Sequence, residues 1–233
     1  MLAGTAVVAI WNGIAPEGRA TFYDWHVHEH IPERVGIPGF LRGRRFVTAG
    51  PDTAPEFFTL YEVTGPEVLT GPDYLARLNA PTAWTRQATA QFRDTTRAAA
   101  AVRASHGPGA GGMLLSLRFE APEAAAAALG DLVAAAARLP RITGAHLCRT
   151  DRAGSGTATE ESRGRTDLGA PPGWFMLAEA TDAAACESVL ATAHLVAAGA
   201  EPAIVRGLYR VEYTRDTMTA PGAGTSSAPA ANR

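Results

Sequence analysis

The chain has 233 residues, of which 46% are hydrophobic and 19% charged, and a formal net charge of −2. This length suits one large domain or two domains of about 100 residues each, and the composition is that of a globular protein. The charge leaves no broad basic surface, which argues against a nucleic-acid partner. All 21 basic residues are arginines, so a Schiff-base lysine, a P-loop lysine and a lysine general base are excluded.

Compartment and membrane signals are weak. Cys148 and Cys186 lack the spacing of a metal-binding or redox motif, which favours two buried thiols in a reducing, cytoplasmic setting. The first residues, MLAGTAVVAIW, have no basic segment before the apolar run, so they resemble a first strand and not a signal peptide. No apolar stretch approaches the roughly 20 residues of a membrane-spanning helix, and we expect no membrane partner.

Strand-like and helix-like patterns alternate along the first half. Short apolar runs of strand length are separated by longer segments with helical periodicity. In chain order the sequence predicts a strand at 5–11, a helix at about 18–36, a corner at 37–39, a second strand that contains 42–45, a third strand at 57–63, a helix at about 72–92 broken at 79–81, and a strand at 97–105. On the second strand Arg42 and Arg44 share a face and Arg45 points the other way.

The same order recurs in the second half. The matching segments are 113–119 for the first strand, 122–139 for the first helix, 142–144 for the corner, 174–180 for the third strand, 183–198 for the second helix and 206–214 for the last strand. Glu62 then corresponds to Glu179. Each half is therefore a β-α-β-β-α-β, ferredoxin-like unit with both helices on one face of its sheet. We expect the two bare faces to pack sheet to sheet as a pseudo-dimeric α+β barrel.

These patterns predict the domain boundaries. Residues 1–106 form a ferredoxin-like repeat that carries the histidine-rich helix, and 107–112 form a glycine-rich linker. Residues 113–215 form a second, degenerate repeat, and 216–233 a disordered tail that cannot build a core. Within the second repeat, 151–173 is long enough to be a mobile surface loop.

The segment 25–39, WHVHEHIPERVGIPG, holds half of the six histidines. At about 100° per residue, one apolar stripe faces the sheet. It is formed by Tyr23, Val27, Ile31 and Val35. His30 lies on one flank of this stripe with His26 beside it, and His28 lies about 160° from His30. Only His26 and His30 can act together.

Three interpretations of these histidines are open. His26-x-x-Glu29-His30 matches an inverted zinc-protease motif, but a zinc site needs a third ligand that no downstream helix supplies. Alternatively, a histidine at the wall of an apolar pocket transfers a proton, with Glu33 or Asp24 setting its tautomer. In the third interpretation, His30 only satisfies the end of the helix before Pro32, and His26 and His28 are solvated.

His30-Ile31-Pro32, preceded by Phe22 and Trp25 and followed by Pro38-Gly39, resembles the EthD-like family of dimeric α+β-barrel proteins. That family has an aromatic-rich first helix, a His-x-Pro, and a Pro-Gly eight residues after the histidine. The resemblance covers about residues 5–105. The second half has no His-x-Pro, so one chain would carry one site.

The resemblance implies small hydrophobic, often aromatic or polyketide-like ligands. It also implies isomerisation, dehydration, cyclisation or cofactor-free oxygenation. Our first hypothesis is a cofactor-independent enzyme in which His30 is the acid/base and His26 assists it. The alternatives are a non-catalytic ligand-binding or accessory protein of a degradation or biosynthetic pathway, and a metalloenzyme using His26 and His30. A homodimer is a further expectation.

Five other residues are candidates for contact with a substrate. Tyr23 and Trp25 are aromatic residues of the histidine-rich helix, and Trp84 follows Pro81, where it is also a simple core anchor. Arg44 could clamp a carboxylate or phenolate, or pair with a glutamate. Tyr61 alternates with Phe57 and Thr59 along a strand and could line the cavity or belong to the core.

Overall fold

The computed structural model describes residues 1–189 and 191–217. The predicted tail comprises residues 216–233. Of these the structure describes Asp216, which ends the last strand, and Thr217. The rest of the tail lies outside the described residues. No helix of the described residues is long and apolar enough to cross a membrane.

The elements of the first half follow the predicted order. They are β1 (Ala6–Ile14), the 3-10 turn η1 (Pro16–Gly18), α1 (Arg19–Trp25), the π-turn η2 (His26–His30), α2 (Ile31–Val35), β2 (Phe40–Thr48), β3 (Phe57–Val63), the 3-10 turn η3 (Pro66–Thr70), α3 (Pro72–Leu78), α4 (Ala83–Thr89) and β4 (Phe92–His106). The predicted break at 79–81 separates α3 from α4, as expected where a proline removes a backbone donor.

The second half follows the same order of strands and helices, with α6 and β7 inserted between its second and third barrel strands. Its elements are β5 (Met113–Phe119), the 3-10 turn η4 (Glu123–Ala125), α5 (Ala126–Ala136), β6 (Ile142–Thr150), α6 (Arg152–Ser155), β7 (Leu168–Gly169), β8 (Trp174–Ala180), α7 (Ala183–Ser188), α8 (Thr192–Ala197) and β9 (Val205–Asp216). The single helix predicted at 183–198 is thus two short helices, α7 and α8.

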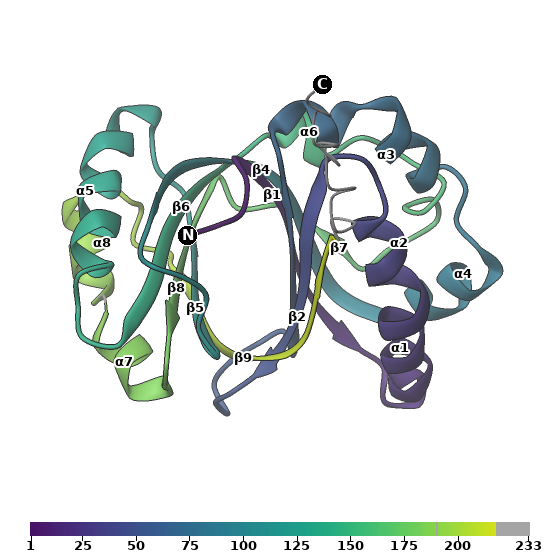
Figure 1. Cartoon of the computed structure of the whole chain (residues 1–233), viewed down its shortest axis with the longest axis horizontal. Helices are drawn as coiled ribbons and strands as arrows, with labels where there is room; N and C mark the ends of the chain where they lie inside the picture. Colours follow the sequence, from purple (N-terminus) through teal and green to yellow (C-terminus); the bar gives the residue numbers. More distant parts are fainter. Residues whose placement is uncertain (190, 218–233) are drawn as a thin grey trace, which may run out of the picture.

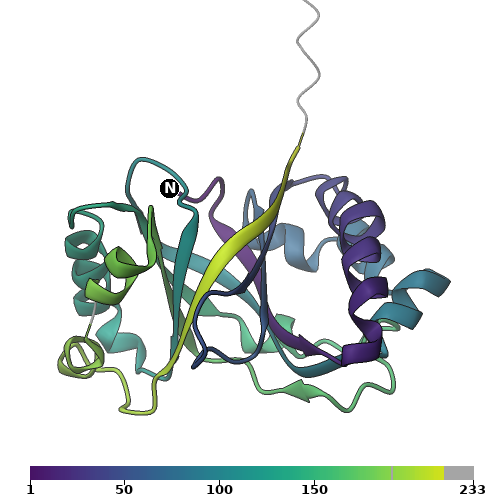
Figure 2. The same cartoon turned by 90° about the horizontal axis from the view of Figure 1, so that it is seen from below.

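Eight strands form one closed antiparallel barrel. The strand order is β1-β3-β2-β9-β5-β8-β6-β4, and a β1–β4 pairing closes the ring. The long strand β9 pairs with β2 of the first half, and β4 pairs with β6 of the second half. The two halves are therefore joined edge to edge, and among the described residues neither half has a free barrel edge. Figure 1 looks along the barrel, and Figure 2 shows β9 crossing between the halves.

Alternating residues of the strands divide between the barrel interior and the helix layers. Trp11, Phe58 and Phe175 pack together inside the barrel with side chains of both halves. The opposite faces of the strands are covered by α1–α4 on one side and by α5, α7 and α8 on the other (Figure 1). The period of two along each strand explains why both faces are apolar.

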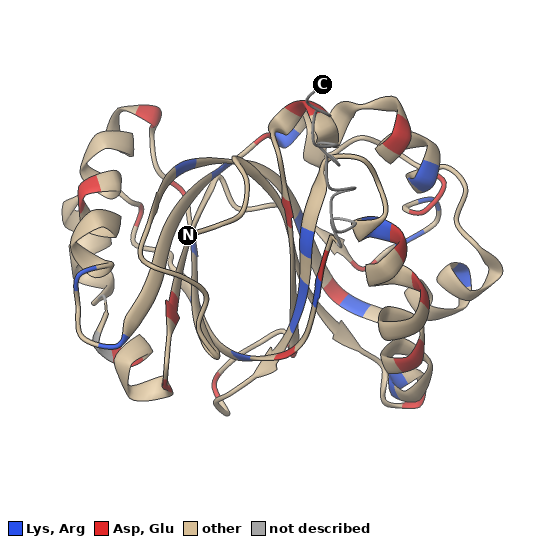
Figure 3. Cartoon of the chain, in the orientation of Figure 1, with Lys and Arg blue, Asp and Glu red and all other residues tan. Residues whose placement is uncertain are grey.

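A buried ionic cluster joins the two halves inside the barrel. Arg44 Nη1 and Nη2 donate to the two Glu179 carboxylate oxygens at 2.7 and 3.0 Å, and Nη2 lies 3.0 Å from Glu62 Oε1. Arg42 also pairs with Glu62. The glutamates that correspond in the two halves of the sequence thus share one guanidinium. Figure 3 marks the basic and acidic positions on the strands that enclose this cluster.

Truncation of the chain before Gly109 should produce a self-associating fragment. Residues 1–108 would lose β9 beside β2 and β6 beside β4, and the apolar inner face of the remaining strands would be exposed. We expect dimers or aggregates in size-exclusion chromatography with light scattering. A monomeric, folded 1–108 fragment would be inconsistent with a barrel that depends on both halves.

Candidate functional site

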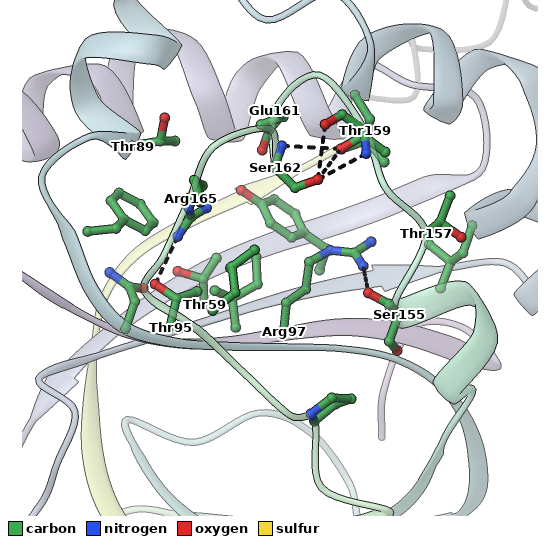
Figure 4. A pocket seen from close by; sticks show the side chains of 18 of the residues that line it. Thr59, Thr89, Thr95, Arg97, Ser155, Thr157, Thr159, Glu161, Ser162 and Arg165 are labelled. Carbon is green, nitrogen blue, oxygen red and sulfur yellow. Dashed lines mark hydrogen bonds between the residues drawn. The ribbon is translucent and has the colours of Figure 1, made fainter.

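A cavity of about 440 Å³ lies between the helices of the first half and the outer face of the barrel. Its floor consists of outward side chains of β1, β3 and β4, and its wall of side chains from α1, η2, α2 and α3. Residues between Gly154 and Pro171 cover it. Figure 4 shows this covering segment arching over the floor residues Thr59, Thr95 and Arg97.

The covering segment comes from the second half of the chain. The sequence suggests a mobile surface loop at 151–173, but in the structure this segment packs over the first half. Its backbone bonds include Glu161 N–H to Leu78 O at 3.0 Å and Thr95 N–H to Asp167 O at 2.8 Å, and β7 pairs with β4. Arg34 also forms an ion pair with Glu161. The cavity therefore requires both halves.

A π-turn sets the orientation of the histidine-rich helix. The N–H of Ile31 bonds to the carbonyl of His26, five residues earlier. Pro32 follows, and its ring would clash with the carbonyl of His28 in a regular helix. The wider turn relieves this clash and shifts the helical phase.

Because of this phase shift, the buried face of the helix differs from the predicted apolar stripe. Ile31 and Val35 are buried as expected, but Tyr23 and Val27 are only half-buried. Trp25, His26, His30 and Arg34 take their place on the buried face, whereas His28 is exposed. A regular helical wheel places His26 further from the sheet than it lies, because it assumes 3.6 residues per turn throughout.

The two buried histidines form a stacked pair. His26 and His30 are 3% and 5% exposed, and their ring centroids are 5.5 Å apart with an interplanar angle of 19°. His30 also stacks on Trp25 at 4.2 Å, and His26 on Phe22 at 4.8 Å. Within the described residues neither Nδ1 atom has a hydrogen-bond partner. Two unpaired imidazole nitrogens are costly to bury unless a ligand uses them.

The predicted carboxylate partners of these histidines lie elsewhere. Glu33 pairs with Arg77 at 3.0 Å and lies 3.6 Å from Arg34, while Asp24 is exposed. Burial is therefore the main influence on the pKa values of His26 and His30. It lowers the pKa of His26 well below 6.5, with Arg45 adding to the effect. It lowers the pKa of His30 likewise, with Arg34 and His26 adding to the effect. Both rings are neutral at pH 7.

The zinc-protease-like motif does not converge on one point. Glu29 Oε1 accepts hydrogen bonds from Thr82 Oγ1 at 2.6 Å and from Thr85 Oγ1 at 3.1 Å, so it is directed toward α4. Across residues 1–189 and 191–217, no group of three or more His, Cys, Asp or Glu side chains is placed to hold a metal ion. The donor set of this cavity thus does not fit a zinc site.

The structure brings four of the seven candidate residues together and places three elsewhere. His26, His30, Trp25 and Tyr61 line the cavity. The Tyr61 hydroxyl is buried and has no hydrogen-bond partner in the described part of the chain, and burial raises its pKa well above 10.0.

Tyr23, Arg44 and Trp84 lie outside the cavity lining. Tyr23 packs on Phe57 at 5.7 Å, with the Arg45 guanidinium over its ring at 4.6 Å. Trp84, near the start of α4, is half-buried and packs against the hydrophobic cluster that includes Phe22 and Phe92. Arg44 points into the barrel, where Glu62 and Glu179 hold it. Of the two expectations for Arg44, pairing with a glutamate and clamping a substrate, the structure shows the pairing with a glutamate.

The sequence interpretation missed several polar lining residues. Arg34, Asn12, Thr95 and Arg97 all face the cavity. Ile10 pairs with Thr59 on one side and with Arg97 on the other, so these three side chains lie on the same face of the sheet. Asn12 and Thr95, each two residues away along its strand, lie on that face as well. Strand alternation could have indicated Arg97 once the register was known, but the register is not readable from the sequence.

The neutral state of the two histidines predicts a pH dependence of stability. In the unfolded chain a histidine takes up a proton below its pKa of about 6.5, whereas His26 and His30 resist protonation in the fold. The unfolded state then binds more protons, so the free energy of unfolding should fall by about 1.4 kcal/mol per pH unit for each histidine as the pH drops from about 6.5.

Urea denaturation between about pH 7.5 and 5.5 measures this slope. His30→Leu should reduce the slope by about half, and His28→Ala, at an exposed position, should leave it unchanged. A wild-type free energy of unfolding that is flat over this range would show that both imidazoles titrate normally.

Comparisons with known proteins reveal likeness in structure only. No protein-family model matches the sequence, and no curated protein matches it. An anthrone oxidase-like protein superposes with a TM-score of 0.58 at 13% identity, covering 91% of this chain and 92% of its own. A candidate monooxygenase from Fusobacterium nucleatum gives a TM-score of 0.56 at 9% identity, covering 92% and 96%. One from Lactobacillus acidophilus gives 0.53 at 11% identity, covering 91% and 97%. The chain thus shares the α+β-barrel fold of these proteins.

Proposed function

We propose that the protein is a cofactor-independent enzyme that transfers a proton to or from a small aromatic or polyketide-like substrate, with His30 as the acid/base and His26 assisting. One observation carries this proposal: two neutral imidazoles, each with a ring nitrogen that has no hydrogen-bond partner among the described residues, lie in a covered cavity beside Trp25 and Tyr61. A neutral imidazole can accept a proton, and a nearby hydroxyl can donate a hydrogen bond to the resulting oxyanion.

The surroundings support a planar, hydrophobic ligand. Trp25 and Phe92 contribute aromatic surface to the lining, and Leu69, Leu75 and Leu78 contribute aliphatic surface. The Tyr61 hydroxyl, held neutral by burial, is a hydrogen-bond donor without a partner among the described residues. Aromatic rings bind well to such walls by stacking and edge contacts.

Anthrone is a suitable first substrate, because a structural neighbour is called an anthrone oxidase-like protein. Loss of a ring-methylene proton to His30 would give a delocalised enolate. The enolate can react with molecular oxygen, and the net reaction converts anthrone and O₂ to anthraquinone and water. These reaction steps require two groups from the protein, a base and a hydrogen-bond donor.

The assay follows anthraquinone formation by absorbance under air, with and without exhaustive chelation. We expect a rate above the uncatalysed reaction that chelation leaves unchanged, because the described donor set does not fit a metal. Stoichiometric zinc or iron that is lost together in His26→Ala and His30→Ala would favour the metalloenzyme. Anthrone binding without turnover would favour the ligand-binding alternative.

We also infer that the halves are tandem copies of one ferredoxin-like unit, bounded at 1–106 and 113–215 with the linker 107–112. Each half has the strand order fourth-first-third-second: β4-β1-β3-β2 and β9-β5-β8-β6. The corresponding positions Glu62 and Glu179 meet at Arg44. Membership of the EthD-like family is supported by the position of His30 in the cavity lining, with Pro32 two residues later in the first turn of α2.

A cytoplasmic location is part of the proposal. Cys148 and Cys186 are both buried and free. Burial raises the pKa of the Cys186 thiol to about 11 and raises that of Cys148 further. Both thiols are thus protonated and unreactive at pH 7, as structural cysteines in a reducing compartment are.

A further inference from the structure

Three arginines line the cavity, and two of them are neutralised. Arg34 forms ion pairs with Glu161 and Glu33. Arg165 binds Asp167 through two hydrogen bonds of 3.0 and 2.6 Å. Arg97 differs, because no carboxylate among the described residues lies within ion-pair distance of it. One cavity cation therefore lacks a counter-charge in the described part of the chain.

Arg97 is held in place by neutral groups. Its Nη2 donates to the Tyr74 hydroxyl at 2.9 Å, and its Nη1 donates to the Ser155 carbonyl at 3.5 Å. Its guanidinium also lies 5.9 Å from the centre of the Tyr74 ring. Figure 4 shows the side chain reaching from the sheet toward Ser155 in the covering segment. A guanidinium has five N–H donors, so several donors remain for a ligand.

The position of Arg97 on the floor complements that of the histidines. Arg97, Ile10 and Thr59 lie side by side on β4, β1 and β3. Tyr61 is two residues further along β3, with its ring 6.2 Å from the His30 ring. Strands are about 4.8 Å apart, so about 10 Å of floor separates the strand of Arg97 from that of Tyr61. A fused aromatic ring system with an acidic substituent can span this floor.

We propose that the cavity binds aromatic carboxylates, with the carboxylate on Arg97 and the ring system extending toward Tyr61 and His30. This inference rests on the proposed function, and it adds the substrate class and the residue that selects it. A guanidinium binds a carboxylate through charge-assisted hydrogen bonds, which are stronger than neutral ones. Binding there would supply the counter-charge that the described protein does not.

The test compares two matched ligands, naphthoate and its neutral isostere naphthamide. Their dissociation constants at pH 7.5 are measured by calorimetry for the wild type, Arg97→Met and Arg97→Lys. We expect the wild type to bind naphthoate about tenfold more tightly than naphthamide, or better. Arg97→Met should abolish this preference with little effect on naphthamide, and Arg97→Lys should retain part of it.

Arg93→Met is the control, because Arg93 lies on the same strand, is exposed, and is absent from the cavity lining. It should keep the full preference. Equal affinity of the wild type for both ligands, or a preference that survives in Arg97→Met, would overturn the role of Arg97 and leave the proposed function standing. Absence of binding by either ligand would count against the aromatic-binding cavity itself, and so against both proposals.

Discussion

His30→Ala and His30→Gln should each lower turnover of the proposed substrate at least about 100-fold, the lower end of a general acid/base contribution. Alanine removes the ring, whereas glutamine keeps a polar side chain of similar reach but cannot exchange a proton near neutral pH. Loss of activity in both variants would therefore identify the imidazole nitrogens, and not side-chain volume, as the requirement.

The neighbouring histidines provide matched controls. His28→Ala should cost almost nothing, because His28 is exposed on the far side of the π-turn. His26→Ala should fall between the two, since its ring stacks 5.5 Å from that of His30. Circular dichroism must show all the variants folded. If His28→Ala were as damaging as His30→Ala, the assigned orientation would be wrong; if none mattered, the accessory-protein alternative would be favoured.

Arg44→Met should destabilise the fold by about 3–5 kcal/mol, the cost of removing one partner from a buried ion pair. Arg44 is 2% exposed, and Glu62 and Glu179 are 0% and 1% exposed. Although burial alone would raise it, His146 and Arg44 hold the pKa of Glu179 below its usual range. Without Arg44, Glu179 loses two hydrogen bonds, and the partners that Glu62 keeps among the described residues are the partly exposed Arg42 and the Ala3 N–H.

Urea denaturation with a matched variant isolates this effect. Arg86→Met removes an exposed arginine from α4 and should change the free energy of unfolding by less than about 0.5 kcal/mol. The triple variant Arg44→Met, Glu62→Gln and Glu179→Gln should recover part of the stability, because no uncompensated charge stays buried. A neutral effect of Arg44→Met alone would show that the cluster does not join the halves.

The barrel was largely predictable because its determinants are local. Strand alternation correctly separates Arg44, which faces the barrel interior, from Arg45, which faces the helices. The same alternation places Tyr61 on the face that the cavity occupies. The similar strand patterns of the two halves led to the expectation of two units that cover each other. The pairing of β4 with β6 and of β2 with β9 depends on strand register, which a sequence pattern does not specify.

The site was predictable only in part, because its determinants are non-local. The π-turn before Pro32 changes the helical phase and buries His26 and Arg34, which a regular wheel does not anticipate. Glu161 reaches Arg34 from a segment more than half the chain away. Nothing in the composition of 151–173 indicates that it covers the first half, so the enclosed cavity could not be deduced.

The proposed function depends on two neutral histidines that face an aromatic ligand in this cavity. Proton–nitrogen correlation NMR of the histidine side chains, recorded between about pH 8 and 5.5, tests it most directly. The signals of His26 and His30 are assigned by their loss in His26→Ala and His30→Ala. We predict that both keep neutral-ring signals throughout this range and that anthrone shifts them. Titration of His26 and His30 near 6.5 with no response to anthrone would contradict the account.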